Sequence, residues 1–240
     1  MCGANVTANV YVDGFNLYNG ALRRKPYRWL DLHALVRNLV SAPNIGRIRY
    51  YTARVRNTAT DPGKQARQAQ YIRALRTVPN LSIHYGHFLT HPVMRPLSTH
   101  PTSAVPPFYV RVIDQGQEIT LPLAPYDAAS PLCFVPVWNT EEKGSDVNLA
   151  THLLWDGVKE EYDIAIVVSN DSDLAEPVNI VKNELGKRII ILNPHRERPS
   201  AELQKIADQF IDIRARHLVG SQFPAILTDG RGEFEKPSTW

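Results

Sequence analysis

Residues 164–173 read IAIVVSNDSD, a run of five apolar residues followed closely by two aspartates, Asp171 and Asp173. A continuous apolar run of this length is typical of a strand that is buried on both faces of a parallel sheet. Carboxylates that follow such a strand lie at its carboxyl end, where open α/β sheets bind their ligands. This stretch therefore predicts a central parallel strand with an acidic site at its end.

Strand and helix patterns alternate on both sides of this stretch. Apolar residues recur at helical spacing after the N-cap candidate Asp31, and Asp61-Pro62 is a typical helix start. The expected strands are 9–13, 45–55, 81–85, 164–168, 188–192 and 210–213, and the expected helices are 31–40, 61–76, 145–155, one ending at 185, and 200–207. This order favours an α/β fold with a mostly parallel sheet covered by helices.

Residues 91–136 interrupt the alternation. They contain 9 of the 18 prolines and show no helical periodicity. Within them, 108–113 and 118–123 flank the turn sequence DQGQ, which predicts a β-hairpin. Insertions of this length are often lids or binding loops. We therefore expect one domain over residues 1–220 that carries the insertion 91–136, followed by a polar C-terminal tail at 221–240.

Composition narrows the class of protein. The 240 residues include only two cysteines, too few for a disulfide framework or a cysteine-based zinc site. No apolar run is long enough for a membrane span, and no signal-peptide pattern begins the chain, so we expect a reduced, cytoplasmic protein. Residues 1–90 carry 13 Lys and Arg against 3 Asp and Glu, whereas residues 91–240 carry 14 against 21. This asymmetry favours a polyanionic partner for the first part of the chain.

Four carboxylates are expected to meet at one edge of the sheet. Asp13 ends the first strand, Asp146 begins the helix after the insertion, and Asp171 and Asp173 follow the apolar strand. Such a cluster repels itself unless a cation neutralises it, and oxygen ligands favour Mg²⁺ or Mn²⁺. Each acid also has a structural explanation as a helix cap or turn residue, and the spacing leaves a phosphate-binding or hydrolase site open.

Three short motifs in this order resemble those of the NYN domain, a PIN-like nuclease family that includes the LabA-like proteins. They are VDGFN at 12–16, KGSD at 143–146 and SNDSD at 169–173. The resemblance implies a Rossmann-like three-layer α/β/α domain that binds a divalent metal and cleaves RNA. The residues that match the metal-binding acids are Asp13, Asp146, Asp171 and Asp173, and Asn16 matches the polar residue that orients water or phosphate.

Two positions depart from the family pattern. Asn170 stands where glycine is usual, and Leu174 stands where phenylalanine is common. Asn tolerates a left-handed backbone better than most residues, so the turn is expected to survive. Neither change removes a carboxylate.

Basic residues near these motifs are candidates for RNA contacts, because Lys and Arg neutralise phosphates. Arg47 and Arg49 also recur on the second expected strand. The candidates that we select are Arg23, Arg24, Lys25, Arg28, Arg54, Arg56 and Lys143.

The leading hypothesis is a metal-dependent endoribonuclease that hydrolyses single-stranded or structured RNA. PIN-like relatives often dimerise, so the resemblance is compatible with a homodimer. The alternative is a non-catalytic RNA-binding regulatory module with the same fold. An aspartyl-phosphate phosphatase ranks last, because that chemistry needs an acid two residues after Asp13, where Phe15 stands.

Overall fold

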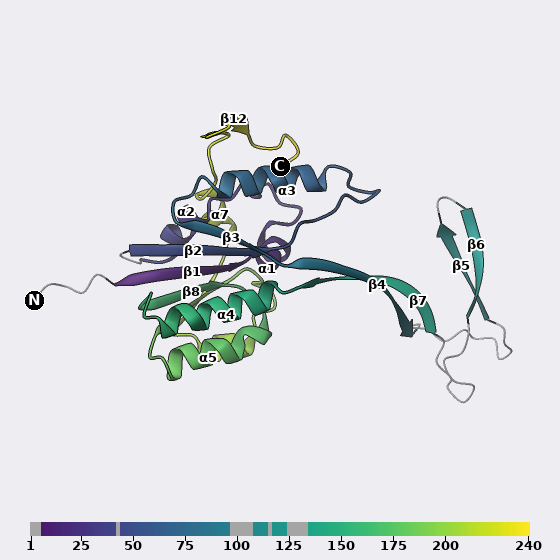
Figure 1. Ribbon diagram of the computed structural model, residues 1–240. Coiled ribbons are helices and arrows are strands. Elements are labelled where there is room, and N and C mark those ends of the chain that lie inside the picture. Colours follow the sequence, from purple (N-terminus) through teal and green to yellow (C-terminus); the bar gives the residue numbers. More distant parts are fainter. Residues whose placement is uncertain (1–5, 42–43, 97–107, 115–116, 124–133) are drawn as a thin grey trace, which may run out of the picture. The chain divides into compact units, whose positions relative to one another are not determined.

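The computed structural model describes residues 6–41, 44–96, 108–114, 117–123 and 134–240 (Figure 1). The chain forms two compact units. The larger unit comprises Met1–Phe88 and Glu142–Trp240, and the smaller unit is Leu89–Glu141.

A six-stranded sheet forms the centre of the larger unit, with the strand order β10-β9-β8-β1-β2-β3. All five neighbouring pairs are parallel. The strands are β1 (Thr7–Asp13), β2 (Asn44–Thr52), β3 (Leu81–Tyr85), β8 (Ile164–Val168), β9 (Arg188–Asn193) and β10 (Gln209–Asp212). The apolar stretch forms β8, which is fully buried and pairs with β1 and β9, as expected for a central strand.

Helices cover both faces of this sheet (Figure 1). One layer contains α2 (Leu32–Leu39), α3 (Lys64–Leu75) and α7 (Ala215–Val219), and the other contains α4 (Ser145–Val158), α5 (Ala175–Asn183) and α6 (Ala201–Ile206). Successive strand residues alternate between the layers, because strand side chains have a period of two. Thus Val10 and Val12 pack with the first layer, and Tyr11 packs with the second. The predicted three-layer α/β fold is confirmed.

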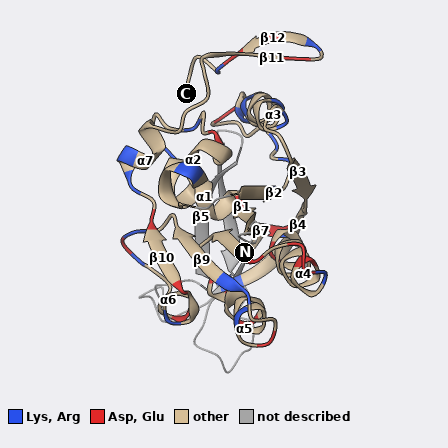
Figure 2. Cartoon of the chain, turned by 90° about the vertical axis from the view of Figure 1, so that its left-hand side faces the viewer, with Lys and Arg blue, Asp and Glu red and all other residues tan. Residues whose placement is uncertain are grey.

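The two helix layers differ in charge. Helices α2, α3 and α7 contain Lys or Arg and no acidic residue, whereas α5 and α6 contain both signs and α4 contains only acids. Figure 2 shows blue residues on α2, α3 and α7 and both colours around α4, α5 and α6. The charge asymmetry of the sequence is therefore also an asymmetry between the layers.

The last twenty residues differ from the expected polar tail. Strands β11 (Ile226–Asp229) and β12 (Gly232–Glu235) form an antiparallel hairpin. Phe223 and Phe234 are buried, and both rings contact Trp29, as does Trp240. Phe223, Phe234 and Trp240 are widely spaced in the sequence, so their shared partner at Trp29 is not visible as a sequence pattern.

The smaller unit contains β-structure. Strands β5 (Phe108–Asp114) and β6 (Gln117–Leu123) pair antiparallel, as the hairpin prediction requires, and the turn residues 115–116 lie outside the described residues. Strands β4 (His87–Pro96) and β7 (Phe134–Lys143) form a second two-stranded sheet. These two strands were not predicted, because they contain prolines and lack a clear alternation of apolar residues.

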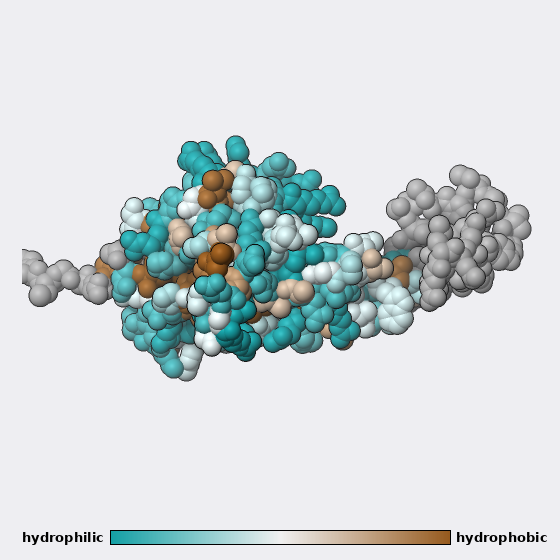
Figure 3. Space-filling model, turned by 90° about the horizontal axis from the view of Figure 1, so that it is seen from above, coloured by the Kyte–Doolittle hydropathy of each residue, from teal (hydrophilic) through white to brown (hydrophobic). Residues whose placement is uncertain are grey.

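Among the described residues, no helix has the length and hydrophobicity of a membrane span. Seen from the side of α3, the described surface is mainly hydrophilic, with hydrophobic colour confined to small spots (Figure 3).

Candidate metal centre

Three aspartates from three elements converge at the carboxyl edge of the sheet. Asp13 is the last residue of β1, Asp146 lies in the first turn of α4, and Asp171 caps the short 3-10 helix η2 (Ser172–Leu174). One carboxylate oxygen from each lies within 4.8 Å of the others. The sheet topology thus brings Asp13 close to two acids that lie more than 130 positions later in the chain.

Hydrogen bonds fix the position of Asp13. Its carboxylate accepts from the backbone N–H of Asn16 at 2.9 Å and from the Ser169 hydroxyl at 3.1 Å. The Ser169 oxygen also accepts from the backbone N–H of Asp171 at 3.1 Å. Ser169 is fully buried and therefore connects the first and third motifs.

The cluster is electrostatically unfavourable by itself. The pKa of Asp13 is raised to about 7, mainly by burial and also by the charges of Asp146 and Asp171, while the hydrogen bonds from Asn16 and Ser169 oppose this rise. Burial also raises the pKa of Asp146, and the charges of Asp171 and Glu142 add to the effect. A bound cation would relieve this repulsion. The oxygen-only donor set and its spacing fit a hard divalent ion such as Mg²⁺ or Mn²⁺.

Asp173, the fourth expected ligand, is not one of these three. It is exposed on η2, and its backbone N–H donates to the Asp171 carboxylate at 3.1 Å. Its charge contributes to the raised pKa of Asp146. The geometry therefore places Asp173 at the rim of the cluster.

Asn16 and Asn170 connect the acids to a neighbouring loop. The Asn16 side-chain oxygen accepts from the backbone N–H of Asn170 at 2.9 Å. The NH₂ group of Asn16 takes no part in this hydrogen bond. The Asn170 side chain donates to the Arg198 carbonyl at 2.8 Å and accepts from the Ser200 N–H at 2.7 Å. Asn170 does not have a positive φ. Its turn therefore needs no left-handed residue, and the side chain instead anchors the loop after β9.

Glu142 is a site residue that the sequence analysis missed. Its carboxylate accepts from the Ser145 hydroxyl at 2.8 Å and from the Ser145 N–H at 3.3 Å, at the start of the helix that carries Asp146. Gly144 (φ 96°) is the N-cap residue of α4. An acid three residues before a helix is a weak signal on its own, so only the structure reveals this contact.

The predicted RNA-contacting residues divide into two groups. Arg23, Arg24, Lys25, Arg54, Arg56 and Lys143 are exposed. Arg28 instead donates to the Thr239 carbonyl at 2.8 Å and lies over the Trp240 ring. Arg47 and Arg49 pair with Glu161 and Asp156, so these two arginines support the fold.

Asp156 is the centre of a second polar cluster, between β2, β3 and α4. It is 1% exposed and accepts from the Tyr11 hydroxyl at 2.8 Å and from two Arg49 nitrogens at 2.9 and 2.8 Å. Beside it, the rings of His84 and His152 lie 4.5 Å apart, and the Tyr51 hydroxyl lies 3.1 Å from His152 Nδ1. Sequence reasoning did not connect these residues, because they come from separate elements.

Comparison with known families supports the motif analysis. Residues 111–214 match the family model of the NYN domain, which confirms the resemblance. This range includes Asp146, Asp171 and Asp173 and does not include Asp13.

Two individual proteins are similar to the chain over most of its length. The 6-hydroxy-3-succinoylpyridine 3-monooxygenase HspA of Pseudomonas putida is 29% identical, over 96% of this chain and 74% of that protein. A crystal structure of a protein of unknown function from Vibrio parahaemolyticus has a TM-score of 0.52 at 14% identity. That match covers 93% of this chain and 99% of the other. At this identity the structural match supports the fold alone.

Proposed function

We propose that this protein is a metal-dependent endoribonuclease that hydrolyses phosphodiester bonds of single-stranded or structured RNA with Mg²⁺ or Mn²⁺. The observation that carries the proposal is the convergence of Asp13, Asp146 and Asp171, with carboxylate oxygens within 4.8 Å of one another. The match to the NYN domain covers Asp146 and Asp171, and it supports the same function.

Each group at the site has a role in this proposal. Asp13, Asp146 and Asp171 would hold the divalent cation, which supplies charge neutralisation and lowers the pKa of water. The Asn16 NH₂ group can donate to a phosphate oxygen, because its carbonyl oxygen is already bonded to Asn170. Asp173 and Lys143 are exposed near the acids along the chain and would contact the scissile region. Hydrolysis by water would leave a 5′-phosphate and a 3′-hydroxyl.

The similarity to a named monooxygenase favours a second candidate, the oxidation of a hydroxypyridine by O₂. This reaction needs an electron donor as well as O₂. Iron sites that activate O₂ commonly use two histidines and one carboxylate. The group of three acids at the sheet edge contains no histidine, so it does not fit an iron site of this kind.

One experiment separates these candidates and the non-catalytic alternative. Purified protein would be incubated with end-labelled RNA and Mn²⁺, without any electron donor, and with EDTA as the control. The nuclease proposal predicts cleavage that EDTA abolishes, with products carrying 5′-phosphates. RNA that stays intact while the protein binds it would favour the regulatory module. Consumption of a hydroxypyridine only when O₂ and a nicotinamide reductant are present would favour the oxygenase.

A further inference from the structure

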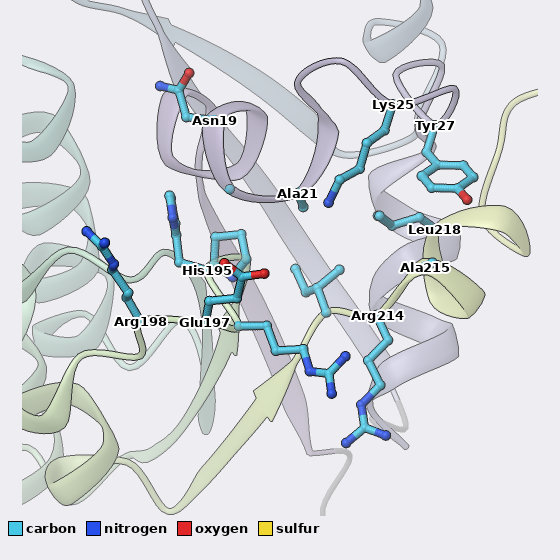
Figure 4. Close-up of a pocket in the computed structure, with 14 residues that line it drawn as sticks. Asn19, Ala21, Lys25, Tyr27, His195, Glu197, Arg198, Arg214, Ala215 and Leu218 are labelled. Atoms are coloured by element: carbon cyan, nitrogen blue, oxygen red, sulfur yellow. The ribbon is translucent and has the colours of Figure 1, made fainter.

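A cavity of about 920 Å³ lies beside the candidate metal centre, at the carboxyl ends of β9 and β10. Its walls come from the π-helical turn η1 (Tyr18–Leu22), the segment that follows η1, and the residues after the two strands. Figure 4 shows Lys25 and Tyr27 on one side of the cavity, and His195 and Glu197 on the other. Its volume is in the range of sites that bind small molecules.

The charged residues that line the cavity favour an anion. They are Lys25, Arg196, Arg198 and Arg214, against the single acid Glu197. Within the described part of the chain, none of these four cations forms an ion pair. All four are exposed, so their charges are available to a ligand. An exposed guanidinium without a carboxylate partner can bind a phosphate through two parallel hydrogen bonds.

Apolar groups line the same cavity. Ala21, Ile213 and Leu218 are buried, and the ring of half-buried Tyr27 completes this part of the wall. A site with both cations and an aromatic ring suits a nucleotide, since bases stack on aromatic rings while phosphates bind Arg and Lys. A purely ionic ligand would not use this apolar wall.

A hydrogen bond and close backbone packing connect the walls of the cavity to the residues of the metal centre. Asn170, which precedes Asp171, donates to the carbonyl of Arg198, a cavity residue. On the other wall, a Cβ placed on Gly20 would lie 2.6 Å from the His195 ring and 2.8 Å from the Pro194 carbonyl oxygen, so η1 packs directly on the loop after β9. The same residues therefore position both the acids and the walls of the cavity.

We propose that this cavity is a nucleotide subsite, which binds the phosphate and base of a residue next to the scissile phosphodiester. The proposal rests on the proposed ribonuclease function and adds residues from the C-terminal part of the chain to the RNA site. Arg196 and Arg214 would bind the phosphate, Tyr27 would contact the base, and Glu197 would weaken anion binding.

The test measures binding of a short single-stranded RNA in EDTA by fluorescence anisotropy. The Arg196→Gln/Arg214→Gln variant should raise Kd at least about tenfold and reduce the slope of log K against log salt by about 0.7, since the two arginines together neutralise one phosphate and each phosphate contributes about 0.7. Glu197→Gln should tighten binding. The matched control is Arg76→Gln/Lys205→Gln, which removes the same charge from exposed positions outside the cavity and should change Kd less than about twofold.

A second measurement identifies the ligand class. AMP should compete with the RNA at the cavity of the wild type, and adenosine should compete at least about tenfold more weakly. Equal loss of affinity in the cavity and control variants, or equal competition by adenosine and AMP, would overturn the subsite proposal. These binding experiments use EDTA, so their outcome does not depend on cleavage. Absence of RNA cleavage in a separate assay with metal would contradict the proposed function, and the binding data would still test the subsite.

Discussion

The Ser169 hydroxyl donates to the Asp13 carboxylate at 3.1 Å and accepts from the backbone N–H of Asp171 at 3.1 Å. One buried side chain therefore sets the position of Asp13, at the end of β1, relative to Asp171, which follows β8. Residues that orient a metal ligand commonly change metal affinity by 10–100-fold when they are mutated.

Ser169→Ala should weaken Mn²⁺ binding by about tenfold, because Asp13 loses a hydrogen bond that orients its carboxylate. Isothermal titration calorimetry with Mn²⁺ measures this change. Ser172→Ala is the matched control, since Ser172 is exposed on the adjacent turn. Equal affinities of Ser169→Ala and wild type would contradict the role of Ser169.

Asp13→Asn should stabilise the metal-free protein at pH 8. Burial raises the pKa of Asp13 to about 7, so the folded state holds this proton more tightly than the unfolded chain, whose pKa is near 4. The metal-free fold therefore loses stability as the pH rises from about 4 through 7. We expect the variant to melt about 5 °C above the wild type in EDTA, measured by differential scanning fluorimetry.

Manganese should reverse this order. A cation that binds only the folded wild type raises its melting temperature, whereas the variant lacks a ligand. A variant that is less stable than the wild type in EDTA, or equally stabilised by Mn²⁺, would contradict this account of the cluster.

The histidine pair should make the fold sensitive to acid. The pKa of His84 is lowered to about 4, mainly by burial and also by the charges of His152 and Arg49, while Asp156 opposes them. The unfolded chain takes up this proton near pH 6.5, so stability is lost as the pH falls from about 6.5 towards 4. Urea unfolding at pH 7 and pH 5 should show a loss about 1 kcal/mol smaller in His84→Gln than in the wild type. Parallel pH profiles of the two proteins would refute the assignment.

Phe234→Ala should destabilise the larger unit by about 3 kcal/mol, because the ring is buried against Trp29. The melting temperature should fall by about 6–12 °C. Ile226→Ala is the control, since Ile226 lies in the same hairpin and is 59% exposed. A similar melting temperature for both variants would mean that the hairpin adds little stability.

Much of the sheet and part of the site follow from local patterns. The apolar run of β8 and the strand pattern that ends at Asp13 place Asp171 and Asp13 at strand ends, and parallel strands bring such ends to one edge. Asp146 was expected there because it begins the helix after the insertion, and the structure brings it to the other two.

Contacts between distant segments were not predictable in this way. The packing of Phe223, Phe234 and Trp240 on Trp29 joins residues that are almost 200 or more positions apart, and no periodicity marks them. The bond between Glu142 and Ser145 depends on how the chain enters α4. Likewise, Arg196 and Arg214 belong to loops whose proximity to Lys25 follows only from the order of the strands.

The most direct test of the central claim is the rate of RNA cleavage by wild type, Asp171→Asn and Asp173→Asn in the presence of Mn²⁺. Asp171 is one of the three converging acids, whereas Asp173 lies at the rim. We predict a loss of at least about 1,000-fold in Asp171→Asn, because the site loses a ligand, and a much smaller loss in Asp173→Asn. Cleavage by folded Asp171→Asn at the wild-type rate would contradict the proposal that this cluster is the nuclease site.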